Sequence, residues 1–372
     1  MIVSKSLDVA KDIKHIHIIC KLLGLAPYKI TKGTFSEEIE IDYTVRNNII
    51  VIVWTSVLAL FLLICIIPTA YIYAYVANLS LSDNLNAFIS IPMVSLVACF
   101  AIIMNLSINK RKITEFFTKI SHIDNKLSSL NVKDSSTNYI KFQDNADILI
   151  FLFVLIPYCV YDTWLWITED TFHIAIALRY GHVVNVSLTI HFCTCVKIIR
   201  KRLAVVCENT EEMRIPSLMT PQLRSLLGDI CEAARILNSI YGPLILLEFT
   251  RLFMIVIVSL NSIVYLLNKS PLKALSLIIW KIMTLSELIY IILTCQMTVT
   301  KLKTLTFSIH NILFQKFHIT VDVFQQFALF LHQISTCGLE FTACGLFKLD
   351  YPFLCSVLTS FISYAVIIYQ FK

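Results

Sequence analysis

The sequence predicts an all-α polytopic membrane protein with seven transmembrane helices. Of its 372 residues, 57% are hydrophobic and only 15% are charged. This composition is too apolar for a soluble domain of that length. Seven apolar segments reach the length of about 20 residues that a helix needs to cross a bilayer. Glycine and proline are sparse, with 7 and 9 residues, so long flexible linkers are not expected.

A cytoplasmic segment, residues 1–47, precedes the first span. The predicted spans, in chain order, are residues 48–76, 86–108, 147–167, 172–199, 245–267, 272–298 and 351–371. The chain therefore divides into six consecutive parts. They are 1–47, the four spans within 48–199, a helical extension at 200–244, spans five and six within 245–298, anchor helices at 299–347 and the last helix at 348–372.

Two amphipathic segments are expected to extend the spans into the cytoplasm. Residues 223–244 lead into the fifth span but carry Arg224, Asp229 and Glu232, which makes them too polar for lipid. Residues 321–346 place Phe324, Phe327 and other apolar residues at helical spacing. A break at 348–352 then splits the last span into a cytoplasmic helix and a membrane helix. The extensions either join subunits or form a membrane-apposed bundle within one subunit.

Basic residues orient the chain. The N-terminal segment and the second, fourth and sixth connections carry seven, seven, six and three lysines or arginines. The alternate connections hold only Lys269 and Lys273. Because cytoplasmic loops are enriched in basic residues, the N-terminus is predicted to be cytoplasmic and the C-terminus extracellular. The net charge of +6 thus reflects membrane topology, not nucleic-acid binding.

Several functional classes fit the sequence poorly. A G-protein-coupled receptor would place its N-terminus outside. No His, Asp or Glu spacing suggests a catalytic or metal site, and no glycine-rich loop suggests a phosphate or cofactor site, so an enzyme is not expected. The twelve cysteines are expected to pack as small apolar residues. A secondary transporter stays open, although no internal repeat is found.

The last predicted helix carries a polar stripe on an apolar cylinder. Its members recur at spacings of four, three, four and three, which keeps them within one band: Ser356, Ser360, Ser363, Ile367 and Gln370. Thr359 and Phe371 flank the band. Such a helix can line a water-filled pore when several copies surround an axis. Phe371 and Gln370 at its outer end could then form the gate. The alternative is that these hydroxyls bond neighbouring helices or their own backbone.

Charged and aromatic residues in the outer halves of the spans are candidates for ligand contacts, because intramembrane charges are costly and usually functional or paired. The candidates are Asp162, Trp164, Arg179, His182, Trp280, Thr284 and Glu287. Aromatic faces with a few donors and acceptors suit a small amphipathic molecule. Each has an alternative. Trp164 can belong to an interfacial aromatic belt, and Arg179 can pair with Asp162 or Glu287. Glu248 and Arg251, three apart, are expected to form a structural ion pair.

The C-terminal segment resembles the signature of insect gustatory receptors. Ser363-Tyr364, five apolar residues and Gln370-Phe371 are similar to that family's Thr-Tyr, five hydrophobics, Gln-Phe. Residues 342–351 and 23–28 also resemble family segments. One position departs, since Ser363 stands where the family usually has threonine.

The resemblance implies a ligand-gated, non-selective cation channel of sensory neuron dendrites, opened by a small-molecule tastant at the plasma membrane. It also implies a homotetramer, or a heteromer with related receptors, with the last helix around the pore and Gln370 and Phe371 at the gate. An odorant-receptor-like subunit that needs a co-receptor, and a secondary transporter, are the alternatives.

Overall fold

The computed structural model describes residues 9–26, 28–32, 39–42, 53–54, 56–58, 60, 81–129, 155–166, 172–212, 220–269, 271–315 and 321–370. The first predicted span, residues 48–76, therefore lies almost wholly outside the described residues. Phe371 also lies outside them.

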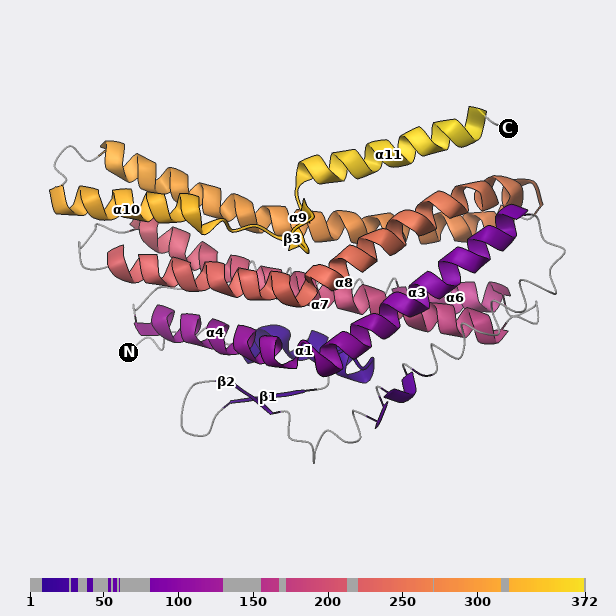
Figure 1. Ribbon diagram of the computed structural model, residues 1–372, viewed down its shortest axis with the longest axis horizontal. Coiled ribbons are helices and arrows are strands. Elements are labelled where there is room, and N and C mark those ends of the chain that lie inside the picture. Colours follow the sequence, from indigo (N-terminus) through magenta and orange to yellow (C-terminus); the bar gives the residue numbers. More distant parts are fainter. Residues whose placement is uncertain are drawn as a thin grey trace.

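The fold is a bundle of long helices that run along a common axis (Figure 1). In chain order the helices are α1 (Val9–Leu22), α3 (Leu81–Ser107), α4 (Lys110–Ser129), α6 (Ile156–Trp166), α7 (Phe172–Glu212), α8 (Thr220–Lys269), α9 (Pro271–Gln315), α10 (Val321–Cys337) and α11 (Tyr351–Gln370). Helices α4 and α10 lie at one end of the bundle, and α6 lies at the opposite end (Figure 1). We call these the α10 end and the α6 end. The predicted all-α fold is confirmed.

Three of these helices are long and apolar enough to cross a bilayer within the described residues, over Arg179–Glu208, Pro221–Ile257 and Ala274–Asn311. Helices α3 and α4 would add a fourth as a bent pair, and Tyr351–Ile367 is a shorter apolar helix. The helices α7, α8 and α9 continue without a break for 41, 50 and 45 residues. The expected boundaries at 199, 244 and 298 thus fall inside continuous helices, although Pro243 lies within α8 at the second of them.

Two small antiparallel hairpins interrupt the helices, and the sequence pattern did not predict them. One pairs β1 (Lys29–Lys32) with β2 (Ile39–Asp42), and the other pairs β3 (Thr342–Ala343) with β4 (Phe347–Lys348). The expected helix over 321–346 ends early for a local reason. Gly338 follows α10 with a φ of 55°, the left-handed conformation that commonly terminates a helix.

Helix α11 begins where a break was expected. The Phe353 amide donates a hydrogen bond of 3.0 Å to the Asp350 carboxylate, which makes Asp350 the N-cap of α11. The helix then runs along one side of the bundle toward the C-terminus (Figure 1). Its start is fixed by the 338–350 connection, which packs on α8. Asn238 donates to the Glu340 carbonyl at 2.6 Å, and Gly242 leaves room for the Cys344 backbone.

Buried and half-buried ion pairs bind the helices at the α10 end. The Arg202 guanidinium on α7 is fully buried and binds both Asp124 oxygens on α4, at 2.9 and 2.8 Å. Lys119 and Lys126 on α4 reach Asp229 on α8, with Lys119 at 2.8 Å.

The cysteine prediction holds in part. Cys20, Cys99 and five other described cysteines without a disulfide are buried, as small apolar packing residues should be. The prediction is wrong for Cys231 on α8 and Cys337 on α10, which form a disulfide. Their separation of 106 residues hides the pairing in the sequence, because only the packing of α10 on α8 brings them together.

Candidate functional site

The polar stripe of α11 faces away from its own subunit. Ser356, Thr359, Ser360, Ser363 and Ile367 are all exposed, as is Gln370. Leu354 and Val357 pack against the hydrophobic core instead, and Phe361 is buried. The helix therefore presents to its surroundings the face that the sequence singles out, and it packs on α8 and α9 through Leu354, Val357 and Phe361, while Ile362 and Val366 are exposed. Phe371 lies outside the described residues.

Three hydroxyls on this face bond to carbonyls of their own helix. Ser356 donates to the Pro352 carbonyl at 2.9 Å, Thr359 to the Cys355 carbonyl at 2.8 Å, and Ser360 to the Ser356 carbonyl at 2.9 Å. This geometry satisfies each hydroxyl proton inside the helix. The hydroxyl oxygens stay on the exposed face as hydrogen-bond acceptors, available to water or to a hydrated cation.

Four of the predicted ligand residues meet near the α6 end of the bundle. We call Asp162, Arg179, His182 and Trp280 the aromatic-charge cluster. Asp162 on α6 pairs with Arg179 on α7, which settles the choice of partner for Arg179. The Arg179 guanidinium lies 4.0 Å from the centre of the Trp280 ring on α9, and the His182 ring lies 4.5 Å from it. Three helices thus contribute to one cation–π arrangement.

Two neighbours extend this cluster. Ser276 on α9 donates a hydrogen bond to Asp162, and Tyr158 on α6 donates to the Ser276 carbonyl at 2.9 Å. Asp162, His182 and Trp280 are only 2%, 1% and 6% exposed. Buried donors and acceptors around an aromatic face are the features expected where a small molecule binds. Ser276 was not predicted, since one serine in an apolar span carries no distinctive sequence signal.

The remaining predicted ligand residues lie elsewhere. Trp164 is 66% exposed, so its ring points away from the cluster, as a residue of an interfacial belt does. Thr284 is fully buried and donates to the Trp280 carbonyl one turn back, at 2.9 Å. Glu287 joins a second network centred on Arg251. Four of the seven predicted residues therefore form the aromatic-charge cluster, Glu287 belongs to the Arg251 network, Thr284 is buried on α9 outside both clusters as defined, and Trp164 is exposed.

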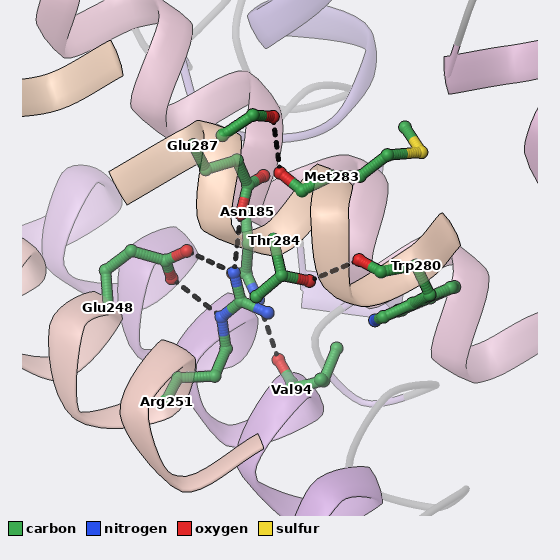
Figure 2. A network of polar contacts seen from close by, with 9 residues as sticks. Val94, Asn185, Glu248, Arg251, Trp280, Met283, Thr284 and Glu287 are labelled. Carbon is green, nitrogen blue, oxygen red and sulfur yellow. Dashed lines mark hydrogen bonds and ion pairs between the residues drawn. The ribbon is translucent and has the colours of Figure 1, made fainter. Parts of the chain in front are cut away.

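Figure 2 shows this second network, here the Arg251 network, made of Arg251, Glu248 and Glu287. Arg251 on α8 is fully buried. Its Nε lies 2.9 Å from Glu248 on the same helix, and its Nη2 lies 3.0 Å from Glu287 on α9. The expected Glu248–Arg251 pair is confirmed, and Glu287 joins α9 to it. Asn185 on α7 donates to the Val94 carbonyl of α3 at 3.2 Å beside it.

Helix α8 links the Arg251 network to α11. Phe249 lies between Glu248 and Arg251 in sequence but contacts Phe347 and Phe353, with ring centres 5.7 and 5.4 Å apart. One turn further on, Phe253 stacks on Phe361 of α11 at 5.2 Å. These aromatic residues were not predicted as functional, although Phe249 and Phe253 are four residues apart and a spacing of four places two residues on one helix face.

The comparisons with known proteins identify the family. The family model described as 7tm chemosensory receptor matches residues 13–372. The chain belongs to this family. It is therefore a multi-pass receptor and not an enzyme. No curated protein matches the sequence.

Solved structures share the fold. The insect olfactory receptor OR5 from Machilis hrabei has a TM-score of 0.74 at 14% identity, over 98% of this chain and 99% of that one. The structure of that receptor in complex with eugenol has a TM-score of 0.68 at the same identity and the same coverage. The predicted membership in a seven-transmembrane chemosensory receptor family is confirmed by the family model, and these structures confirm the fold.

Proposed function

We propose that this chemosensory receptor is a gustatory receptor and acts as a ligand-gated, non-selective cation channel. One observation carries the proposal. The polar stripe of α11 is exposed on the single chain, while the apolar edge of the same helix packs on α8 and α9. The hydroxyl oxygens and the Gln370 amide on that exposed face are better solvated by water than by lipid. Four copies around an axis supply it by enclosing a water-filled path.

In the proposed assembly the receptor is a homotetramer in the plasma membrane of a sensory dendrite, with its N-terminus in the cytoplasm. Ser356, Thr359, Ser360, Ser363 and Ile367 line the pore, and Gln370 with Phe371 forms its outer gate. The proposed lining holds no acidic side chain, so discrimination among cations is weak.

The proposed ligand site is the aromatic-charge cluster. A small molecule that stacks on Trp280 competes with Arg179 and His182 for the ring, and it changes how α7 and α9 pack. The Arg251 network passes the change in α9 to α8 through Glu287, and the Phe249 and Phe253 contacts pass it on to α11. The eugenol complex of the similar olfactory receptor supports a small organic ligand for this fold.

Expression of the chain alone, in cells without other chemoreceptors, tests the proposal. Sugars, bitter alkaloids and amino acids are applied while membrane current is recorded. A ligand-dependent inward current supports the gustatory channel if the substitution Gln370→Ala changes which ions carry that current. The matched control is Ser335→Ala, which removes an exposed hydroxyl that bonds only its own helix on α10 and leaves permeation unchanged.

Two other outcomes favour the alternatives. Surface expression without current, followed by current when a related subunit is added, favours an odorant-receptor-like subunit that needs a co-receptor. Saturable uptake of the ligand without a ligand-dependent conductance favours a secondary transporter.

A further inference from the structure

The chain turns sharply between α3 and α4. The segments Pro92–Ser107 and Lys110–Ser129 meet at 70°, and we call this corner the elbow. A cavity of ≈ 580 Å³ lies against it. Its lining comes from the last turn of α3 and the first turns of α4: Ser107, Ile108, Lys110, Arg111, Thr114 and Glu115.

The elbow is held rigidly in place. Asn109, at the corner, is fully buried. Its side-chain amide donates to Asn105 at 3.1 Å and to the Ile240 carbonyl of α8 at 3.3 Å. Three residues on, Lys112 donates to the Ser239 carbonyl at 3.3 Å. These bonds fix the corner to α8, so the cavity is preformed and not a product of a loose loop.

An exposed apolar stripe on α3 leads into the cavity. Leu96, Phe100 and Ile103 are 49%, 36% and 49% exposed, and their spacing of four and three places them on one face. Ser107, four residues further, continues that face into the lining, and Ile108 beside it is 58% exposed. In a membrane protein, an exposed apolar stripe of this kind contacts acyl chains.

The charge at the end of the stripe is basic. Lys110 and Arg111 are exposed at the cavity, with Glu115 as the one acid in its lining. Lys119 and Lys126, further along α4, are bound to Asp229. In the part of the chain that the structure describes, Arg111 has no carboxylate within ion-pair distance. Its planar guanidinium is suited to bidentate binding of a phosphate.

We propose that the elbow binds one anionic phospholipid, with the phosphate on Arg111 and Lys110 in the cavity and an acyl chain along Leu96, Phe100 and Ile103. The inference rests on the proposed orientation, which places the elbow in the inner leaflet, where anionic lipids are concentrated. It does not depend on channel activity. The occupant is a lipid and not a free anion, because the cavity is continuous with an apolar face that water solvates poorly.

Lipid titration of the full chain, purified in neutral detergent and followed by native mass spectrometry, tests the site. The probes are dioleoyl phosphatidylglycerol, dioleoyl phosphatidylcholine and inorganic phosphate. We expect the first phosphatidylglycerol to bind more tightly than phosphatidylcholine. Because a basic residue near an anionic lipid surface contributes a factor of about five in affinity, Arg111→Gln should lower phosphatidylglycerol binding about fivefold and leave phosphatidylcholine binding unchanged.

Two further variants keep the test decisive. Glu115→Gln removes the only repelling charge in the lining and is expected to tighten phosphatidylglycerol binding, an effect that misfolding would not produce. Lys303→Gln, which removes an exposed lysine on α9 away from the elbow, should leave all three probes unchanged.

Equal binding of both lipids, or equal losses in Arg111→Gln and Lys303→Gln, would overturn the proposal. If inorganic phosphate displaces phosphatidylglycerol and phosphatidylcholine does not, the cavity is assigned to a soluble anion. That result would overturn the proposal too. A receptor that binds phosphatidylglycerol as expected but conducts no current would leave the lipid site standing and count only against the channel.

Discussion

The Arg251 network gives the sharpest prediction about stability. Arg251 is fully buried, and its two carboxylate partners, Glu248 and Glu287, are 1% and 8% exposed. Arg251→Met removes the only cation of this network and leaves two buried carboxylates together. Loss of one member of a buried ion pair costs about 3–5 kcal/mol, because the remaining charge is uncompensated. We therefore expect a large loss of stability from this one substitution.

Glu287→Gln is the graded comparison. The glutamine amide oxygen still accepts from Arg251, and Glu248 still balances its charge, so only the difference between a charged and a neutral hydrogen bond is lost, about 1 kcal/mol. In the triple variant Arg251→Met, Glu248→Leu and Glu287→Leu, no charge remains unpaired. Apolar replacement of a whole buried ion network is often neutral, so this variant should recover most of the lost stability.

Thermal unfolding of the purified receptor in one detergent at neutral pH, followed by tryptophan fluorescence, compares these variants. The expected order of stability is wild type, then Glu287→Gln, then Arg251→Met, with the triple variant above Arg251→Met. If Arg251→Met unfolds at the same temperature as Glu287→Gln, the two carboxylates do not depend on this guanidinium, and the reasoning is refuted.

Three further predictions concern other sites. Asp124→Ala leaves the buried Arg202 without its bidentate partner and should destabilise the receptor by about 3–5 kcal/mol in thermal unfolding; an unchanged midpoint would contradict this. Burial lowers the pKa of His17 from 6.5 to about 4, although a backbone hydrogen bond with Tyr28 opposes this shift. Between these pH values the unfolded chain therefore binds more protons than the folded one. The free energy of unfolding should fall as the pH drops from 6.5 toward 4. His17→Gln should flatten that dependence, and an equally steep profile would speak against it. Trp280→Ala removes the ring beneath Arg179 and should raise the half-maximal ligand concentration at least about tenfold, as loss of a buried aromatic contact implies; an unaltered dose–response curve would exclude the cluster as the ligand site.

The sequence predicted best what depends on one helix. The stripe of α11 follows from the spacing of its serines alone, and the Glu248–Arg251 pair follows from a separation of three. Both need only the helical period. The start of α11 after Asp350 was likewise visible in a local break.

Partners on different helices could not be predicted in the same way. The sequence does not say which face of α4 meets α7, so the Asp124–Arg202 pair, 78 residues apart, was missed. For the same reason the pairing of Glu287 on α9 with Arg251 on α8 was not predicted. The exposure of Trp164 also depends on how α6 is rotated against α7, which composition does not determine.

Cysteine accessibility on α11 tests the central claim most directly, that the stripe faces a shared aqueous path. Ser360→Cys, on the stripe, is compared with Leu354→Cys, on the face packed against the core, while ligand-evoked current is recorded with a small cationic thiol reagent. Cys355, exposed near the stripe, is first replaced by serine in both variants. We predict that the reagent blocks current through Ser360→Cys, faster when ligand is present, and spares Leu354→Cys. Block of Leu354→Cys with Ser360→Cys untouched would contradict the account.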